Sequence, residues 1–297
     1  MSHFIYADHA ATTAVSDTAL QAMLPHFTAA YGNPSSLYRF AQEGKTDLER
    51  ARAEIAACLN ARPEEIYFTS GGTEADNWAL RGVAELMALK GRKGGHIITS
   101  AIEHHAVLHT AQYLEKQGYE VTYLPVDGRG LVDPAALEGA IRPDTILISI
   151  MAANNEIGTI EPVAELGRIA RAHKVLFHTD AVQAVGHIPV DVEAWNVDLL
   201  SLSAHKFRGP KGVGALYVKK PLRLPALIQG GGQEKGRRSG TENVPGAVGM
   251  AAALREAGVP PPGRPAGQAH RRPDRASLHP PHRRPGEPPA RHRLLCL

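Results

Sequence analysis

The chain has 297 residues, of which 43% are hydrophobic and 21% charged, with two cysteines and a formal net charge of +3. This composition excludes fibrous and fully disordered proteins, and no apolar run approaches the roughly 18 residues that a membrane-spanning helix needs. Two cysteines are too few for a disulfide framework or a zinc cluster, and the first residues lack the pattern of a secretory leader. We therefore expect a cytoplasmic protein with no metal site and no membrane partner.

Charge is distributed unevenly along the chain. The segment Pro260–Leu297 holds ten Pro and eight Arg but only two acidic residues, so it supplies a charge of +6. The preceding 259 residues therefore carry a net charge of −3, which gives no electrostatic case for binding nucleic acid. Because the segment lacks the apolar surface of a core, we predict that residues 259–297 form a disordered tail. A shifted reading frame would produce this composition, and a natural Pro-rich tail is the alternative.

Short apolar runs alternate with helical patterns along the rest of the chain. The predicted helices are Asp47–Leu59, Thr73–Leu89, His104–Gln117, Val163–His173 and Gly246–Ala257. The predicted strands are Glu65–Thr69, His96–Ser100, Val121–Leu124, Thr145–Met151, Val175–Thr179, Leu199–Leu202 and Gly214–Val218. This alternation is typical of an α/β fold in which helices cover both faces of a mostly parallel, here seven-stranded, sheet. Ligands of such folds bind at the carboxyl ends of the strands.

One strand leads directly into a lysine. The predicted strand Leu199–Leu202 is followed by Ser203, His205 and Lys206 and then by a glycine-rich turn. Burial and neighbouring cations lower the pKa of a lysine, so an amine in a pocket at a strand's end can form an imine. Lys211 is expected to be solvated because it follows a Gly-Pro turn. Lys206 is therefore the candidate, and an ordinary surface lysine is the alternative.

A second strand ends at a carboxylate, Asp180, with Gln183 three residues beyond. A carboxylate that faces an imine-forming lysine is the pair that pyridoxal phosphate requires, because the lysine binds the aldehyde and the carboxylate keeps the pyridine nitrogen protonated. Gln183 could then donate a hydrogen bond to the phenolic oxygen of the ring. The alternative role for Asp180 is to cap the segment that follows it.

A glycine-rich turn supplies a candidate phosphate site. Gly72 and Thr73 lie between a predicted strand and a predicted helix, so backbone N–H groups and the helix dipole point at one place. Ser203 and His205 could reach the same phosphate from a neighbouring strand. A simple tight turn is the alternative. A Walker motif is excluded because Arg39 stands where that motif needs glycine.

Two further polar residues follow predicted strands. His104 opens a predicted helix, where its imidazole could stack on the cofactor ring and relay protons. Asn155 follows the strand Thr145–Met151 and could bind the phenolic oxygen or the substrate. His105 and His109 stand four residues apart, but no acidic or cysteine partner accompanies them, so we interpret them as solvated.

These segments together resemble the cysteine desulfurases of the class-V aminotransferase family. The resemblance rests on eight motifs in the family's order: ADHAATT (7–13), GNPSS (32–36), FTSGGTEADN (68–77), EHHAV (103–107), NNEIG (154–158), TDAVQ (179–183), SAHKFRGPKGVG (203–214) and GGGQEKGRRSGTEN (230–243). It implies a homodimeric enzyme of fold type I that uses pyridoxal 5'-phosphate. Nine of the ten site residues take a role from it. Lys206 is the Schiff-base lysine, Asp180 binds the pyridine nitrogen, Gln183 and Asn155 bind the phenolic oxygen, and His104 stacks on the ring. Thr73, Ser203 and His205 bind the phosphate, and Thr241 binds the phosphate of the partner subunit. The tenth, Gly72, is assigned by the glycine-rich turn described above.

The resemblance also implies domains and a reaction. We expect an N-terminal arm over residues 1–15, a cofactor-binding large domain over 16–258, and a small C-terminal domain that is largely missing. The implied reaction converts L-cysteine to L-alanine, with Lys206 and His104 as catalytic groups. Sulfur then passes through a cysteine on a mobile loop to an acceptor or scaffold protein for iron–sulfur cluster assembly or thiolation.

The two cysteines depart from the family's pattern. Neither Cys58 nor Cys296 lies in a matching motif, and Cys58 is expected to be a packed core thiol. We therefore predict that sulfur transfer by this chain is impaired. The alternatives are a selenocysteine lyase or another class-V enzyme, and a truncated fragment without catalytic activity.

Overall fold

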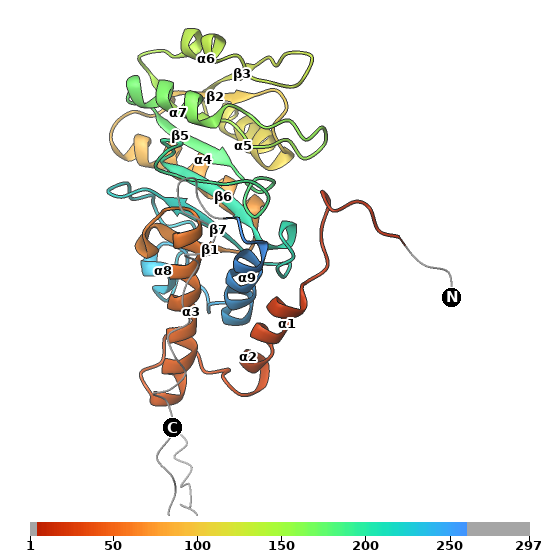
Figure 1. The fold of residues 1–297 in the computed structure, drawn as a ribbon. Coiled ribbons are helices and arrows are strands. Elements are labelled where there is room, and N and C mark those ends of the chain that lie inside the picture. Colours follow the sequence, from red (N-terminus) through yellow and green to blue (C-terminus); the bar gives the residue numbers. More distant parts are fainter. Residues whose placement is uncertain (1–4, 260–297) are drawn as a thin grey trace, which may run out of the picture.

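The computed structural model describes residues 5–259, and within them a seven-stranded sheet forms the centre of the molecule (Figure 1). The strands are β1 (Ile66–Thr69), β2 (His96–Ser100), β3 (Glu120–Leu124), β4 (Thr145–Ser149), β5 (Leu176–Asp180), β6 (Leu199–Ser203) and β7 (Gly214–Val218). Their order across the sheet is β1-β7-β6-β5-β4-β2-β3, and only β7 runs antiparallel to its neighbours. The prediction of a mostly parallel seven-stranded sheet is confirmed.

Helices cover both faces of this sheet. They are α1 (Asp17–Met23), α2 (Pro25–Thr28), α3 (Arg39–Cys58), α4 (Gly72–Leu89), α5 (His105–Glu115), α6 (Pro134–Ala140), α7 (Val163–Ala172), α8 (Gln233–Gly236) and α9 (Val244–Ala257). Apolar residues of α4 and α5 form one core with the sheet, and those of α1, α3, α6, α7 and α9 form the other. Every residue of β2, β4, β6 and β7 is buried, as expected for strands that are covered on both sides.

The first long helix differs from its prediction. The sequence pattern predicts a helix over Asp47–Leu59, but α3 begins eight residues earlier, at Arg39. Ala41 and Gly44 lie on the buried face of the added turns. Glycine is about 1 kcal/mol less favourable than alanine in a helix, so the intrinsic propensity of Gly44 argues against a helix at this position. The packing of this small residue against neighbouring backbone favours the helix. A Cβ at Gly44 would lie 3.1 Å from the carbonyl oxygen of Gly32.

Four helices were absent from the sequence prediction, namely α1, α2, α6 and α8. The helix α6 carried a recognisable signal, because Asp133 accepts a hydrogen bond from the backbone N–H of Ala135 and Pro134 occupies the first turn. Most of the predicted tail lies outside the described residues. Among residues 5–259, no helix has both the length and the apolar character that crossing a bilayer requires.

Candidate active site

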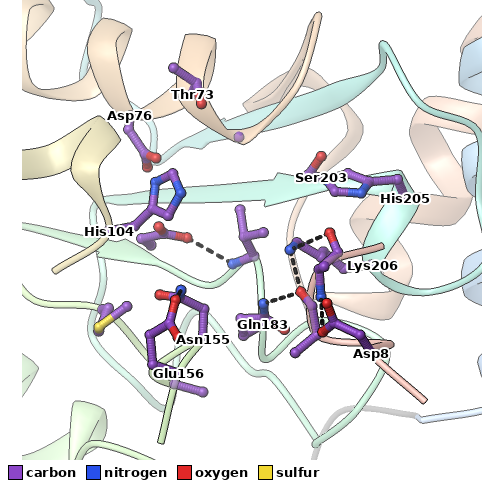
Figure 2. Close-up of a pocket in the computed structure, with 17 residues that line it drawn as sticks. Asp8, Thr73, Asp76, His104, Asn155, Glu156, Gln183, Ser203, His205 and Lys206 are labelled. Carbon is purple, nitrogen blue, oxygen red and sulfur yellow. Dashed lines mark hydrogen bonds between the residues drawn. The ribbon is translucent and has the colours of Figure 1, made fainter. Parts of the chain in front are cut away.

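A cavity of about 450 Å³ lies at the carboxyl ends of β5 and β6 (Figure 2). Nine of the ten predicted site residues line it: Gly72, Thr73, His104, Asn155, Asp180, Gln183, Ser203, His205 and Lys206. The tenth, Thr241, is exposed and lies outside the cavity lining.

Strand ends and helix starts bring these residues together. Asp180 is the last residue of β5, and Ser203 is the last residue of the adjacent β6. Gly72 begins α4, and His104 is the N-cap of α5. Because the carboxyl ends of parallel strands meet at one edge of a sheet, residues more than 100 positions apart converge there.

The carboxyl group of Asp180 is buried, with 5% of the residue exposed. Burial raises its pKa, whereas the backbone N–H of Val182 and the nearby His104 and Lys206 oppose that rise. The Val182 N–H donates to Asp180 Oδ1 at 2.9 Å. Asp180 therefore caps the turn after β5 and also faces Lys206 in the cavity.

Lys206 reaches the same cavity from the helical turn after β6 and is half-buried. Its Nζ donates hydrogen bonds to the carbonyl oxygens of Ala10 and Ala11, the latter at 3.0 Å. Burial lowers its pKa from 10.5, opposed by Asp180 and Asp8. At a given pH, a larger fraction of Lys206 is therefore in the neutral, nucleophilic form than in an exposed lysine. Lys211 is exposed in the following turn, as expected.

The N-terminal segment forms one wall of the cavity. Besides contacting Lys206, the Ala10 carbonyl accepts a hydrogen bond from Gln183 Nε2 at 2.9 Å. The Thr12 hydroxyl lies 3.1 Å from His205 Nδ1, and the Thr13 N–H donates to the His205 carbonyl at 3.0 Å. Sequence reasoning used this segment as a family motif but assigned no site role to it. Its backbone carbonyls accept the hydrogen bonds of Lys206 and Gln183. A pattern of side chains in the sequence does not reveal hydrogen bonds to backbone carbonyls.

The phosphate loop lies beside Ser203 at the amino end of α4. Ser203 is buried, and His205 is half-buried with a pKa that burial and the charges of Lys206 and Lys211 lower. The loop can approach β7 closely because residue 214 is glycine. A Cβ at Gly214 would lie 2.5 Å from the Leu202 carbonyl oxygen and 2.8 Å from the backbone of Gly71.

His104 and Asn155 line the opposite side of the cavity. His104 Nδ1 accepts the backbone N–H of Ala106 at 3.1 Å, which leaves the neutral ring with its proton on Nε2. Asn155 Nδ2 donates to Glu156 Oε1 at 2.9 Å. His105 is exposed on α5, and within residues 5–259 no three potential ligands gather around a possible metal position.

Sequence reasoning missed three buried titratable residues at or near the cavity. They are Asp76 on α4, Glu103 between β2 and α5, and His178 on β5. Asp76 lines the cavity itself. The available signal was its spacing, because a residue four positions after Gly72 lies one helical turn further along the same face of α4.

Cys58 is half-buried and does not line this cavity. It packs against the core cluster, and burial raises its pKa to about 11, with a further rise from Glu54. A thiol with this pKa is almost entirely protonated at neutral pH, so it is a poor nucleophile. The expectation of a packed core thiol is confirmed. Cys296 lies outside the described residues.

The donor set of the cavity fits pyridoxal phosphate. Asp180 is a buried acceptor for a cationic ring nitrogen, and Lys206 is an amine of lowered pKa for a carbonyl carbon. Thr73, Ser203 and His205 offer hydroxyl and imidazole groups for a phosphate. The three kinds of group line one cavity, as this ligand needs.

The class-V aminotransferase family matches residues 5–257 of the chain. Among curated relatives, a protein named cysteine desulfurase IscS from Methanosarcina thermophila is 58% identical over 83% of this chain and 60% of its own length. A putative cysteine desulfurase IscS 1 from Bacillus subtilis is 51% identical over 84% of this chain and 65% of its own length. The chain thus spans about 60 to 65% of the length of these two relatives.

Solved structures share the fold. A NifS-like protein superposes with a TM-score of 0.83 at 47% identity, covering 86% of this chain and 70% of its own. A structure titled SspA in complex with cysteine superposes with a TM-score of 0.82 at 43% identity, covering 85% of this chain and 72% of its own.

Proposed function

Because the chain belongs to the class-V aminotransferase family, we propose that its cavity binds pyridoxal 5'-phosphate and releases sulfur from L-cysteine with formation of L-alanine. The observation that carries this proposal is that Asp180 and Lys206, which follow two adjacent strands, line one cavity with the phosphate loop. A relative named for this activity and a neighbouring structure titled as a cysteine complex support the choice of substrate.

Each residue of the cavity has a defined part in this proposal. The cofactor, when bound, supplies a ring that accepts electrons from the substrate's α-carbon. Asp180 holds the proton on the ring nitrogen, and Thr73, Ser203 and His205 hold the phosphate. Gln183 and Asn155 orient the ring through its phenolic oxygen, and Gly72, which is part of the phosphate loop, leaves room for the side chain of Val182.

Proton transfer falls to Lys206 and His104. Once its contacts with Ala10 and Ala11 break, Lys206 Nζ is free to remove the α-proton of the substrate. His104 stacks on the ring and moves a proton through Nε2. We further propose a homodimer in which Thr241, exposed outside this chain's own cavity, contacts the phosphate bound by the partner subunit.

Sulfur transfer needs a thiolate, and among residues 5–259 no cysteine lines this cavity. Cys58 is half-buried with a raised pKa and does not line the cavity, so we propose that sulfur transfer by this chain is slow without an added thiol. A cytoplasmic acceptor or scaffold protein that supplies iron–sulfur cluster assembly or thiolation would receive the sulfur.

The test of this proposal begins with the purified full chain and added pyridoxal phosphate. We expect a visible absorption band that Lys206→Ala abolishes and that the matched control Lys211→Ala retains. A chain that binds no pyridoxal phosphate would overturn the proposal in favour of a fragment without catalytic activity.

Substrate choice is measured on the loaded protein. Alanine release from L-cysteine should rise about tenfold or more when a small thiol such as dithiothreitol is added. The added thiol takes the place of a protein nucleophile, and a tenfold rise corresponds to lowering the activation free energy by about 1.4 kcal/mol. Release from L-selenocysteine but not from L-cysteine would favour the selenocysteine lyase alternative.

A further inference from the structure

Three acidic side chains are buried at or next to the cavity, and two of them, Asp76 and Asp180, line it. Asp76 is 1% exposed, and Glu103 and Asp180 are each 5% exposed. They come from α4, from the segment after β2, and from the end of β5. Neighbouring carboxyl groups in a medium of low dielectric constant cannot all be ionised, so the proton must stay on some of them.

Asp180 and Asp76 differ in what stabilises their negative charge. Asp180 accepts the Val182 N–H, and Lys206 and His104 are close enough to favour its charge. Asp76 Oδ1 is buried and has no hydrogen-bond partner among residues 5–259. Of these two carboxyl groups, Asp180 is therefore the one on which the negative charge is favoured.

The groups that face Asp76 from the sheet and from the segment before α5 offer no cation. His178 Nε2 lies 3.6 Å from Asp76 Oδ1, but both ring nitrogens are engaged, by Ser149 Oγ at 2.8 Å and Ser201 Oγ at 3.0 Å. Burial lowers the His178 pKa to about 3, so the ring is neutral. The other titratable neighbours are the acids Asp180 and Glu103.

We propose that Asp76 is a positioning residue that stays protonated. Of the two carboxyl groups Asp76 and Asp180 at the base of the cavity, only Asp180 then carries a negative charge. The proposal rests on the proposed role of Asp180 toward the cofactor's ring nitrogen. One carboxylate matches one cationic nitrogen, whereas two would place an excess negative charge in a cavity that also takes up a phosphate. Burial and the charge of Asp180 raise the pKa of Asp76, and the Ser201 hydroxyl opposes that rise only in part, which agrees with this division.

Infrared spectroscopy of the full chain without cofactor tests the proton directly. A protonated carboxyl group absorbs separately from a carboxylate, and we expect Asp76→Asn to remove one such band at pH 7. Glu103→Gln is the matched control, because burial raises the Glu103 pKa to about 8 and its band should disappear when the pH passes that value. A carboxylic-acid region that Asp76→Asn leaves unchanged at pH 7 would overturn the proposal.

The pH dependence of unfolding gives a second measurement. Asp76 keeps its proton in the folded state and loses it in the unfolded state between about pH 4 and its raised pKa, so the folded state loses stability as pH rises. Over that window the unfolding equilibrium constant of the natural chain should rise up to about tenfold per pH unit relative to Asp76→Asn. Parallel curves for the two proteins would contradict a proton on Asp76.

Binding of pyridoxal phosphate separates this inference from the proposed function. Asparagine at 76 is neutral like the protonated acid, so Asp76→Asn should change the dissociation constant by less than about threefold, whereas Asp180→Asn should weaken binding by about 30-fold, or two kcal/mol. Equal weakening by both variants would show that Asp76 acts as a second anion and would overturn the inference. Equally weak binding by all three proteins would overturn the proposed function, while the infrared bands would still decide where the proton lies.

Discussion

Gly214, the first residue of β7, shows how one missing Cβ shapes the cavity. Its position is surrounded by backbone, which cannot move aside as the end of a long side chain can. The loop that carries Gly71 and Gly72 therefore lies directly against the sheet, and the amino end of α4 is held next to Ser203. The strand pattern predicted β7, but the need for glycine there follows only from the approach of the loop.

We expect Gly214→Ala to lower the free energy of unfolding by about 2 kcal/mol, because the added methyl group overpacks a site lined by backbone atoms. Displacing the loop should also weaken pyridoxal phosphate binding. Gly139→Ala is the control, since a Cβ at that position of α6 meets no atom within 4 Å, and it should stabilise the helix by up to about 1 kcal/mol. Urea denaturation measures both. Similar changes in the two variants would argue against close contact at Gly214.

At the scale of elements, a buried ion pair fastens the segment around α8 to the rest of the domain. Arg52 on α3 donates to both carboxylate oxygens of Glu234, each at 2.8 Å, and both side chains are 3% exposed. Glu234 also accepts the Phe68 N–H of β1 at 3.0 Å. Its backbone lies in the left-handed region at φ 47°, a strained conformation that these contacts hold in place.

Removing one partner of this pair leaves the other charge buried. We expect Glu234→Gln to lower the free energy of unfolding by about 3 kcal/mol, because the buried Arg52 then keeps only the half-exposed Glu49 as a counter-ion. Glu64→Gln is the control, since it breaks the exposed pair with Lys220 and should produce no measurable change. Thermal or urea unfolding of the two variants compares them, and equal stability of the two would contradict an anchoring role for Glu234.

At the scale of the whole molecule, large apolar side chains stay exposed at one end. They lie on α1, α2 and the segment that leads into α3: Leu20, Leu24, Phe27, Tyr31, Leu37, Tyr38 and Phe40. Figure 1 places α1 and α2 together at the lower end, below the sheet. Exposed apolar groups gathered in this way are typical of an interaction surface.

We expect this surface to bind a hydrophobic dye such as ANS. Replacing Leu24 and Phe27 with Ser should lower the dye fluorescence by about half, because it removes two large apolar contacts from one patch. Leu89→Ser is the control, since Leu89 is 74% exposed and is the last residue of α4, outside the segment that carries the patch. Equal loss of fluorescence in the control would show that the dye does not select the patch.

By itself, the sequence determined the local pattern of this protein and most of its cavity. Apolar runs and helical spacing located all seven strands within a few residues, and strand ends placed Asp180 and Lys206 at one edge of the sheet. These features are encoded by neighbouring residues, because periodicity and turns are local properties of a chain.

Tertiary structure alone decided what depends on distant segments meeting. It reversed β7 within the sheet, brought the carbonyls of Ala10 and Ala11 to Lys206, and enclosed Asp76 between α4 and the sheet. Backbone carbonyls leave no trace in a side-chain pattern, and the state of a buried acid is set by the charges and dipoles that the fold places around it. The division of charge between Asp76 and Asp180 is therefore a property of the folded molecule.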